Sequence, residues 1–356
     1  MSVRTPWQDL YAVQQECTVA SWPTFEADTK IGIEGIGPSG LANGKFIIPI
    51  TEHAHLNPGA SAVEHELAFG QSDRSTLEYN TVVTQPPTTT LTMPLTSYNL
   101  SLFAWLLFQT GTSETLATTV QTMTCVPYTE ATTEVYAHVA RLLGNYNSDL
   151  SVDTRTHIMR SCICNSLSIN GEEGDILMLT AELMGTQWLQ CTPNVIANAA
   201  HWSSLNYSTK TPLKWQNMTT KLGNAALDIP GFSCTISNNA QAKYYAGSTI
   251  KRFVLGRLGG EGSIFIPWSD TGAGENDVIN MYTSDADTVI MVYNTDGATT
   301  ENTIDIKANI KFTEVNFEGD VELGSQISFQ TVDDGTNTSI VLKCGYRAVD
   351  LHRNVP

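Results

Sequence analysis

Histidine and glutamate side chains are concentrated in residues 51–67, where together they could bind a metal ion. The side chains concerned are His53, His55 and His65, with Glu52, Glu64 and Glu66. A His-x-His pair on a strand directs both imidazoles to one face, which suits zinc. The His-Glu-x-x-His spacing of metalloproteases is absent, however, and no nearby cysteine completes a site. Solvated loop side chains are therefore the favoured interpretation, and no metal is expected.

The cysteines and glycines do not complete a catalytic motif either. Cys162 and Cys164 fit neither a redox CxxC pair nor a zinc knuckle, and on a strand both thiols would face one side, as small core residues do. The Gly-rich segments 31–45 and 255–263 lack the signatures of phosphate-binding loops, and no Gly-x-Ser-x-Gly elbow occurs. The sequence therefore nominates no nucleophile, base and orienting group, and it predicts a protein that is not an enzyme and uses no cofactor. The seven cysteines are interpreted as reduced core thiols, because their spacing has no repeat: 17, 125, 162, 164, 191, 234 and 344.

The charge of the chain argues against a protein that grips nucleic acid. The formal net charge is −17 at pH 7, whereas phosphate binding requires clustered lysine and arginine. An acidic surface past which DNA moves without sticking is compatible with this balance. Residues 210–257 contain seven basic and one acidic side chain, whereas residues 258–340 contain two basic and fifteen acidic ones. Such segments could meet across subunit contacts or neutralise each other within one subunit. No apolar run is long enough to span a membrane.

The elements that must position these residues are predominantly strands. Apolar residues fall at every second position in 304–312, 232–236 and 327–332, and residues 88–96 form a Thr-rich β run. Turn signals separate such runs: Asn170-Gly171, Asp296-Gly297, Glu318-Gly319-Asp320 and Asp333-Asp334-Gly335. The pattern predicts a mainly β fold.

Helix signals are few. Residues 97–109 begin with Ser, contain good helix formers and are followed by Gly111, which predicts one short helix. Residues 133–143 fit a helix or a strand, and the alternation of Val135, Ala137 and Val139 favours the strand. Residues 30–75 lack long periodic stretches and are expected to form an extended loop, of a length that is usually functional or ordered by a partner.

One segment carries a family resemblance. Residues 159–185, MRSCICNSLSINGEEGDILMLTAELMG, have the pattern of a strand, a Gly-containing turn and a second strand ending in Gly. This segment resembles a hairpin of the major tail tube proteins of long-tailed, siphovirus-like bacteriophages. Three flanking features agree with it: 87–108 looks like the family's strand and short helix, 231–240 followed by 250–268 like its next strand, crossing segment and strand, and 304–344 like its closing strands.

The resemblance implies a β-barrel or β-sandwich with a short flanking helix and long loops. The expected organisation is an N-terminal β segment with a Gly-rich loop arm (residues 1–86, the arm at about 30–75), a tail-tube core (87–268) and acidic C-terminal strands that complete it (269–356). Six copies would form a ring by joining sheets edge to edge, and stacked rings would form a hollow tube through which the genome leaves the virion. The partners implied are further copies of this chain, other tail proteins at the tube ends, and viral DNA that passes without specific binding.

Two sets of residues are candidates for these roles. Carboxylates on or beside the expected hairpins could line the lumen and repel phosphates, although they could equally face outward for solubility: Glu172, Glu173, Asp175, Asp305, Glu314 and Glu318. The loop arm could reach a neighbouring ring, with its candidate residues Gly35, Gly37, Gly40, Asn43, His53 and His55. The expected location is the virion tail, after assembly in the host cytoplasm.

Other classes of protein stay open at this point. Residues 1–86 and 269–303 match nothing in the resemblance, so a distal tail or terminator protein is an alternative. A receptor-binding or decoration β module is a second alternative, with the tryptophans and tyrosines as stacking platforms. A β-rich hydrolase would require paired carboxylates that converge in a cleft.

Overall fold

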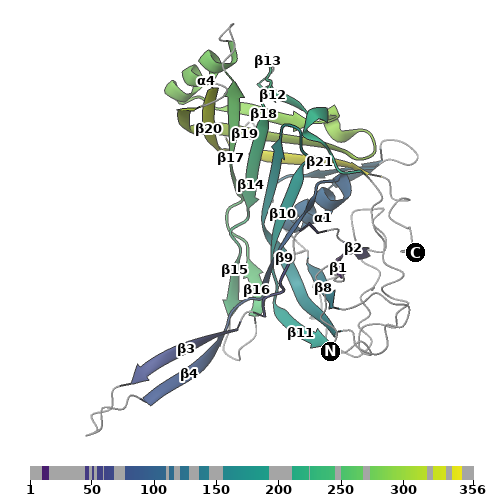
Figure 1. The fold of residues 1–356 in the computed structure, drawn as a ribbon, viewed down its shortest axis with the longest axis vertical. Helices are drawn as coiled ribbons and strands as arrows, with labels where there is room; N and C mark the ends of the chain where they lie inside the picture. The colour runs from purple at the N-terminus through teal and green to yellow at the C-terminus, as the bar shows by residue number, and fades with distance from the viewer. Residues whose placement is uncertain are drawn as a thin grey trace.

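The computed structural model of the chain describes residues 10–15, 45–47, 50–51, 54–58, 60–67, 77–109, 112–115, 121–127, 136–143, 155–191, 211–223, 225–244, 250–267, 273–318, 324–333 and 339–346. The fold within these ranges is mainly β, as predicted (Figure 1). Its helices are α1 (Ser97–Phe108) and α4 (Ala273–Thr283). Its strands are β1 (Leu10–Gln15), β2 (Lys45–Ile47), β3 (Ala60–Leu67), β4 (Leu77–Thr84), β5 (Thr88–Pro94), β6 (Thr112–Thr115), β7 (Gln121–Cys125), β8 (Ala137–Leu143), β9 (Arg155–Glu172), β10 (Met178–Met184), β11 (Gln187–Cys191), β12 (Thr219–Leu222), β13 (Ala225–Ala226), β14 (Gly231–Ser237), β15 (Gln241–Tyr244), β16 (Ile250–Val254), β17 (Gly259–Pro267), β18 (Thr288–Tyr293), β19 (Thr303–Glu318), β20 (Gly324–Thr331) and β21 (Ile340–Tyr346).

The main sheet is antiparallel and runs in the order β5-β10-β9-β14-β17-β20-β19. At β19 the sheet branches. The first half of this long strand lies between β18 and β21, while its second half pairs with β20. Beyond β18 come β12 and β13, and beyond β21 come β7 and β6.

Strand β9 also belongs to a second group of strands. Its first half pairs with β8 on one side and β11 on the other, and β8 leads on to β1 and β2. Ser161 in β9 has a left-handed backbone (φ 44°), and the register of β9 shifts against both β8 and β10. Such irregularities bend a strand and increase its twist, which lets one strand serve two differently oriented sheets.

Helix α1 lies inside the structure, against β9, β21 and β7 (Figure 1). It begins after Thr96, whose hydroxyl accepts a hydrogen bond from the Asn99 N–H at 3.2 Å, and it ends at Gln109 in the left-handed conformation (φ 57°). All its residues except Trp105 are buried. A helix that is apolar all round belongs in a core rather than on a surface, and the predicted helix 97–109 is thereby confirmed.

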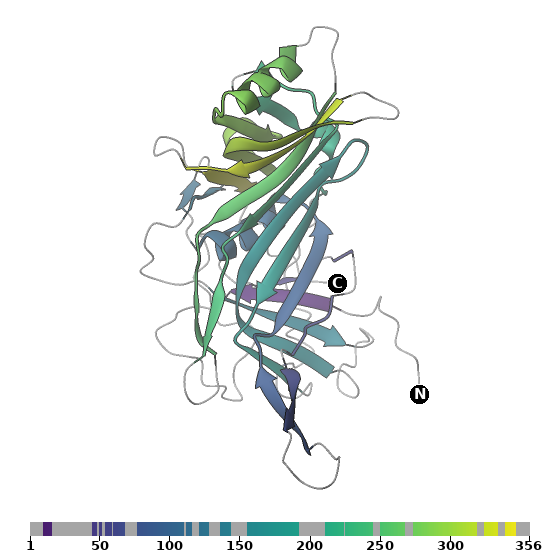
Figure 2. The ribbon, with the colours of Figure 1, turned by 90° about the vertical axis from the view of Figure 1, so that its left-hand side faces the viewer.

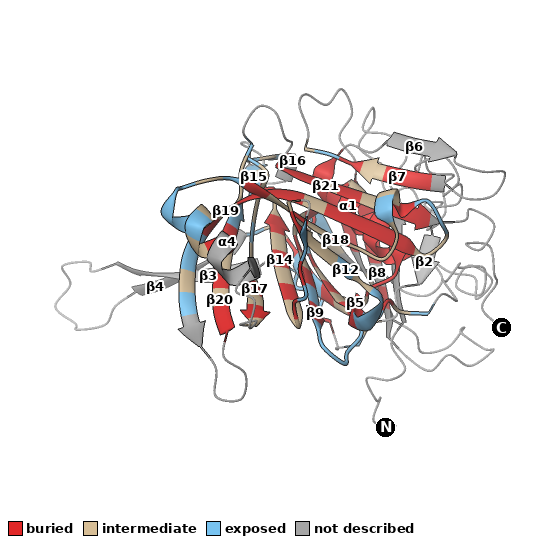
Figure 3. Ribbon diagram, turned by 90° about the horizontal axis from the view of Figure 1, so that it is seen from above, coloured by how far each residue is buried: buried red, intermediate tan, exposed pale blue. Residues whose placement is uncertain are grey.

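The core follows from the alternation read in the strands. On β14, Phe232, Cys234 and Ile236 are buried and the residues between them are half-exposed. The same alternation of buried and more exposed residues occurs on β5, β10 and β20, and Figure 3 colours the ribbon by this burial. One face of the sheet is therefore apolar and covered while the other is polar. The strands predicted at 304–312, 232–236 and 327–332 are confirmed, and residues 137–143 form strand β8, as favoured.

Two local predictions are corrected. Asn170-Gly171 is not a turn, because β9 continues to Glu172 and the chain turns at residues 173–174. Gly171 instead leaves room for the indole of Trp215, whose Cε3 would be 2.6 Å from a Cβ atom there. Helix α4 was not expected, since its sequence AGENDVINMYT has little apolar periodicity. The buried Val278 anchors it to the core.

The expected extended loop at 30–75 is also corrected in part. Strand β3 falls within it and pairs with β4 over eight residues, from Ala60 opposite Thr84 to Leu67 opposite Leu77. Residues 30–44 lie outside the described ranges. The β3–β4 hairpin, called the arm below, forms a sheet of its own and extends away from the body (Figures 1 and 2).

Candidate functional site: the polar face of the main sheet

The polar face of the main sheet carries rows of polar side chains that cross the strands in register. One row joins β5 to β20 through directly opposed residues: Thr92, Thr180, Ser168, Thr235, Glu261 and Gln330. A second joins β5 to β14 in the same way: Thr90, Glu182, Ser166 and Ser237. Hydroxyl groups therefore dominate this face, which we call the polar face.

Neighbouring hydroxyls on the polar face hydrogen-bond to each other. The oxygens of Ser168 and Thr235 are 2.7 Å apart, and those of Thr92 and Thr180 are 3.3 Å apart. Cross-strand hydroxyl pairs of this kind stabilise a sheet. Because these hydroxyls bond to each other, they have fewer donors and acceptors left for a passing ligand.

From β5 to β20 the charges of the polar face are negative, whereas beyond β20 the same face also carries Lys307, Lys221 and Lys343. Glu172, Glu182, Glu261 and Glu314 are exposed on β9, β10, β17 and β19. Lys311 of β19 lies opposite Gln330, at the end of the first row, and supplies a positive charge there. Its ammonium is 2.8 Å from Asp285, and that hydrogen bond raises the pKa of Lys311. From β5 to β20 an approaching anion therefore meets carboxylates and hydroxyls, and the neighbouring Lys311 is already paired.

Aromatic rings beneath the polar face keep these strands together. Trp215 is stacked on Phe232 with ring centroids 6.5 Å apart, and Phe232 on Phe329 at 6.4 Å. The Trp215 indole N–H donates to the Ile229 carbonyl at 3.2 Å. The rings reach this arrangement because Gly171 and Gly262 have no side chain where the rings lie. The polar face thus rests on a continuous apolar layer that fixes its shape.

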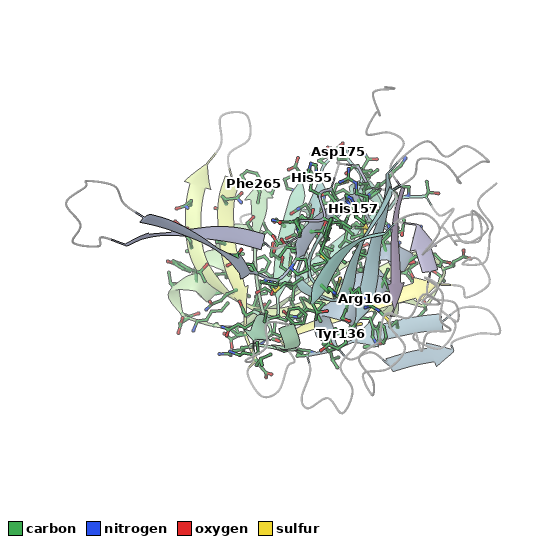
Figure 4. All side chains as sticks on the ribbon, turned by 90° about the horizontal axis from the view of Figure 1, so that it is seen from below. His55, Tyr136, His157, Arg160, Asp175 and Phe265 are labelled. Atoms are coloured by element: carbon green, nitrogen blue, oxygen red, sulfur yellow. The ribbon has the colours of Figure 1, made fainter. Side chains whose placement is uncertain are left out.

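The structure places the predicted lumen carboxylates in three environments. Glu172, Glu173 and Asp175 are exposed at the end of β9 and in the turn to β10. Glu172 and Glu173 line an open depression of about 540 Å³ together with Phe265 of β17; Figure 4 labels Phe265 and Asp175. Glu314 is exposed on β19, and the side chain of Glu318 lies outside the described residues.

Asp305 is the exception, because its carboxylate is buried (1% exposed). Its Oδ2 accepts a hydrogen bond from the Gly297 N–H at 3.0 Å and lies 3.5 Å from the Lys307 ammonium, whereas Oδ1 has no hydrogen-bond partner in the described part of the chain. Burial raises the pKa of Asp305 despite Lys307 and the Gly297 N–H. The position expected for Asp305 is therefore corrected: it lies inside the protein and cannot line a lumen.

Glu182 and Glu261 were missed as members of the polar face. The signal that could have found them is alternation: Glu182 lies between the buried Ala181 and Leu183, as expected for the outward position of a half-buried strand. For Glu261 the neighbouring glycines hide the pattern.

Of the residues predicted to contact a neighbouring ring, only His55 lies in the described ranges. It is exposed, in a segment that pairs with the edge of β5 through Asn57, whose N–H donates to Thr88 at 2.9 Å. Figure 4 labels its position. Gly35, Gly37, Gly40, Asn43 and His53 lie outside the described residues.

The described thiols are core residues, as expected. Cys125, Cys162, Cys164, Cys234 and Cys344 are free and buried. Burial raises the pKa of Cys234 to about 12, so this thiol is protonated at neutral pH. Within the described ranges no three metal-ligating side chains come together, and no helix there is long and apolar enough to cross a membrane.

Comparison with known proteins identifies the family. A search of curated proteins finds no match to the chain. A family model described as phage tail tube protein matches residues 72–332, which is most of the chain and includes every strand of the polar face. A mainly antiparallel β structure with an enclosed helix agrees with the fold that the resemblance implied. The chain is a structural protein of the virion and belongs to the phage tail tube protein family.

Proposed function

We propose that this chain is the repeating subunit of a tail tube, with six copies in each ring and rings stacked into a hollow conduit for the genome. The polar face carries this proposal. It is a broad, continuous surface of hydroxyls and carboxylates on a rigid apolar layer, and in the proposal it lines the lumen.

The chemistry of the polar face suits DNA that must move. Tight, non-specific binding of DNA comes from lysine and arginine contacts to phosphates, which release counterions. Glutamates instead repel phosphates and keep the backbone at a distance. The lumen candidates are thus Glu172, Glu173, Asp175, Glu314 and Glu318, joined by Glu182 and Glu261.

Ring closure would use the edges of the sheet. Within the described residues the main sheet ends at β13 and at β6, whereas Thr51 and Asn57 already hydrogen-bond along part of the outer edge of β5. An unpaired edge is a template for a strand of another copy, and a head-to-tail contact that closes produces a ring.

The arm and the segment before it would contact a neighbouring ring, as proposed for Gly35, Gly37, Gly40, Asn43, His53 and His55. In this proposal the chain has no catalytic role and takes no cofactor. Other tail proteins cap the tube ends, and assembly takes place in the host cytoplasm.

Negative-stain electron microscopy of the purified protein tests the proposal. We expect rings or hollow tubes with a central channel, formed alone or after addition of tail-tip complexes that initiate assembly. Protein that forms neither under both conditions, over a range of concentration and salt, would exclude a tube subunit. It would instead favour a terminator protein or a decoration module.

A further inference from the structure

Two hairpins leave the main sheet and carry opposite charge. One is the arm, β3–β4. The other is β15–β16, called the basic hairpin below, which continues β14 and β17 beyond the sheet as a two-stranded sheet of its own (Figures 1 and 2). Both lie toward the same end of the molecule in the two views.

The strands of the arm are acidic. Glu64 and Glu66 are in β3 and Glu78 is in β4, and neither strand contains lysine or arginine. Glu66 lies directly opposite Glu78 in the register. Like charges at directly opposed positions destabilise an antiparallel pair, and an isolated two-stranded hairpin is marginally stable at best. The arm therefore places two acidic residues at opposed register positions, an arrangement that favours a basic partner.

The basic hairpin has the complementary arrangement. Residues 238–258 contain lysine or arginine at 243, 251, 252 and 257 and no acidic residue. Lys243 lies directly opposite Arg252 in the register. Lys243 is exposed, and its ammonium donates to Gln241 of its own strand at 3.2 Å.

The base of the basic hairpin is fixed to the body. Phe253 is 2% exposed and packs with Tyr136, Ile163 and Ala240. At the junction with β14, the Asn238 side-chain amide donates to the Cys164 carbonyl at 2.7 Å, and the Ala240 N–H donates to Asn165 Oδ1 at 3.0 Å. The basic hairpin is thus a preformed surface, and little ordering opposes binding to it.

We propose that the arm of one copy docks on the basic hairpin of a second copy, matching the register position shared by Glu66 and Glu78 to the one shared by Lys243 and Arg252. Each such contact brings an acidic element against a basic one, and complementary charge sets its register. A second copy is favoured over nucleic acid because the same chain supplies a matched acidic element for each basic one. This inference rests on the proposed tube function and specifies the partner surface of the arm.

Charge reversal with rescue tests the pairing. The arm variant is Glu66→Lys/Glu78→Lys, the hairpin variant is Lys243→Glu/Arg252→Glu, and the combined variant contains all four changes and restores the wild-type net charge. Asp228→Lys/Asp287→Lys, at two exposed positions outside the polar face and the arm, has the same net charge as the arm variant and is its control. Glu66→Gln/Glu78→Gln removes the charge without reversing it. Circular dichroism and thermal unfolding verify that each variant is folded.

Sedimentation velocity and electron microscopy then measure assembly. We expect each reversal to raise the protein concentration at half-assembly at least about tenfold at low salt, with the glutamine variant in between and the Asp228→Lys/Asp287→Lys control unchanged. The combined variant should recover assembly. An equimolar mixture of the arm and hairpin variants should assemble where neither does alone, because each supplies the opposite charge to the other.

The outcomes separate the pairing from the proposed function. If the wild type forms tubes and the folded variants assemble equally well, or if the combined variant and the mixture both fail to recover, the pairing is wrong and the tube function stands. Assembly that depends on the basic hairpin only when DNA is present would identify nucleic acid as its partner and overturn the pairing. A wild type that never associates overturns both. If the reversals abolish rings and the combined variant restores them, the pairing acts within a ring. If the reversals abolish tubes but leave rings, and the combined variant restores the tubes, the pairing acts between rings.

Discussion

At the scale of single residues, the carboxylate of Asp305 is the most buried of the predicted lumen carboxylates whose side chains the structure describes. It is held by the Gly297 N–H and the Lys307 ammonium, while its second oxygen has no hydrogen-bond partner in the described part of the chain. Burying an ionised group is costly unless all its hydrogen bonds are replaced. The raised pKa of Asp305 expresses this cost.

We expect Asp305→Asn to change the pH dependence of stability. Because the pKa of Asp305 is higher in the folded protein than the ordinary 3.8, the folded state binds the proton more tightly than the unfolded state does. The stabilisation that the protonated Asp305 carboxyl contributes is therefore fully present below pH 3.8 and is lost as the pH rises through its pKa in the folded protein. Asparagine does not titrate, so the variant should gain stability relative to the wild type over that range.

Denaturant unfolding of both proteins between pH 3 and pH 7 measures this difference. Asp228→Asn, at an exposed position, is the control. A difference between Asp305→Asn and wild type that is constant with pH would contradict the burial argument.

At the scale of elements, strand β17 fits between β14 and β20 because Gly262 leaves space on the apolar side. A Cβ atom there would be 2.2 Å from the Ser233 carbonyl oxygen and 2.4 Å from Phe329 Cζ. Both distances are below any contact that a real Cβ makes, and the backbone oxygen cannot move aside without distorting β14.

We expect Gly262→Ala to lower the free energy of unfolding by about 1–3 kcal/mol, the usual range for overpacking a core. Gly259→Ala on the same strand is the matched control, because nothing lies within 4 Å of its Cβ position. Denaturant unfolding of the unassembled protein compares the two. Equal stability of the two variants would show that β14 and Phe329 shift enough to accommodate the added methyl group without loss.

The strands and the enclosed helix were predictable because their patterns are local. Alternation at 232–236 and 304–312 and the Ser-to-Gly boundaries around 97–109 need no knowledge of the rest of the chain. Gly171 and Asp305 were misread because a distant element decides their environment: Trp215 covers the first, and the turn at Gly297 encloses the second. The two rows of the polar face that contain Glu182 and Glu261 likewise appear only once the register across the strands is known.

At the scale of the whole molecule, the charge of the polar face determines how DNA would pass through the proposed lumen. Replacing glutamate by lysine at Glu172, Glu182 and Glu261 should retard DNA without preventing tube assembly. For each lysine that contacts a phosphate, the logarithm of the DNA-binding constant falls more steeply with the logarithm of the salt concentration, by about 0.9 in slope. The delay should therefore shrink as the salt concentration is raised.

DNA ejection from particles that carry these tubes measures the effect. The glutamine variants at the same positions are the control, since they remove repulsion without adding attraction. Ejection rates that match the wild type at low salt would show that the polar face does not line the path of DNA.

The pairing of β7 with β21 has a consequence for the synthesis of the protein. Cys125 lies opposite Leu342, so a strand from the first half of the chain finds its neighbour only near the end. Closing so long a loop is entropically costly before the contact is made, and sheets rich in such distant pairs form slowly. The sheet around α1 therefore cannot be completed before β21 has left the ribosome. The concentration of incomplete, edge-exposed chains in the cell then depends on the folding rate as well as on expression.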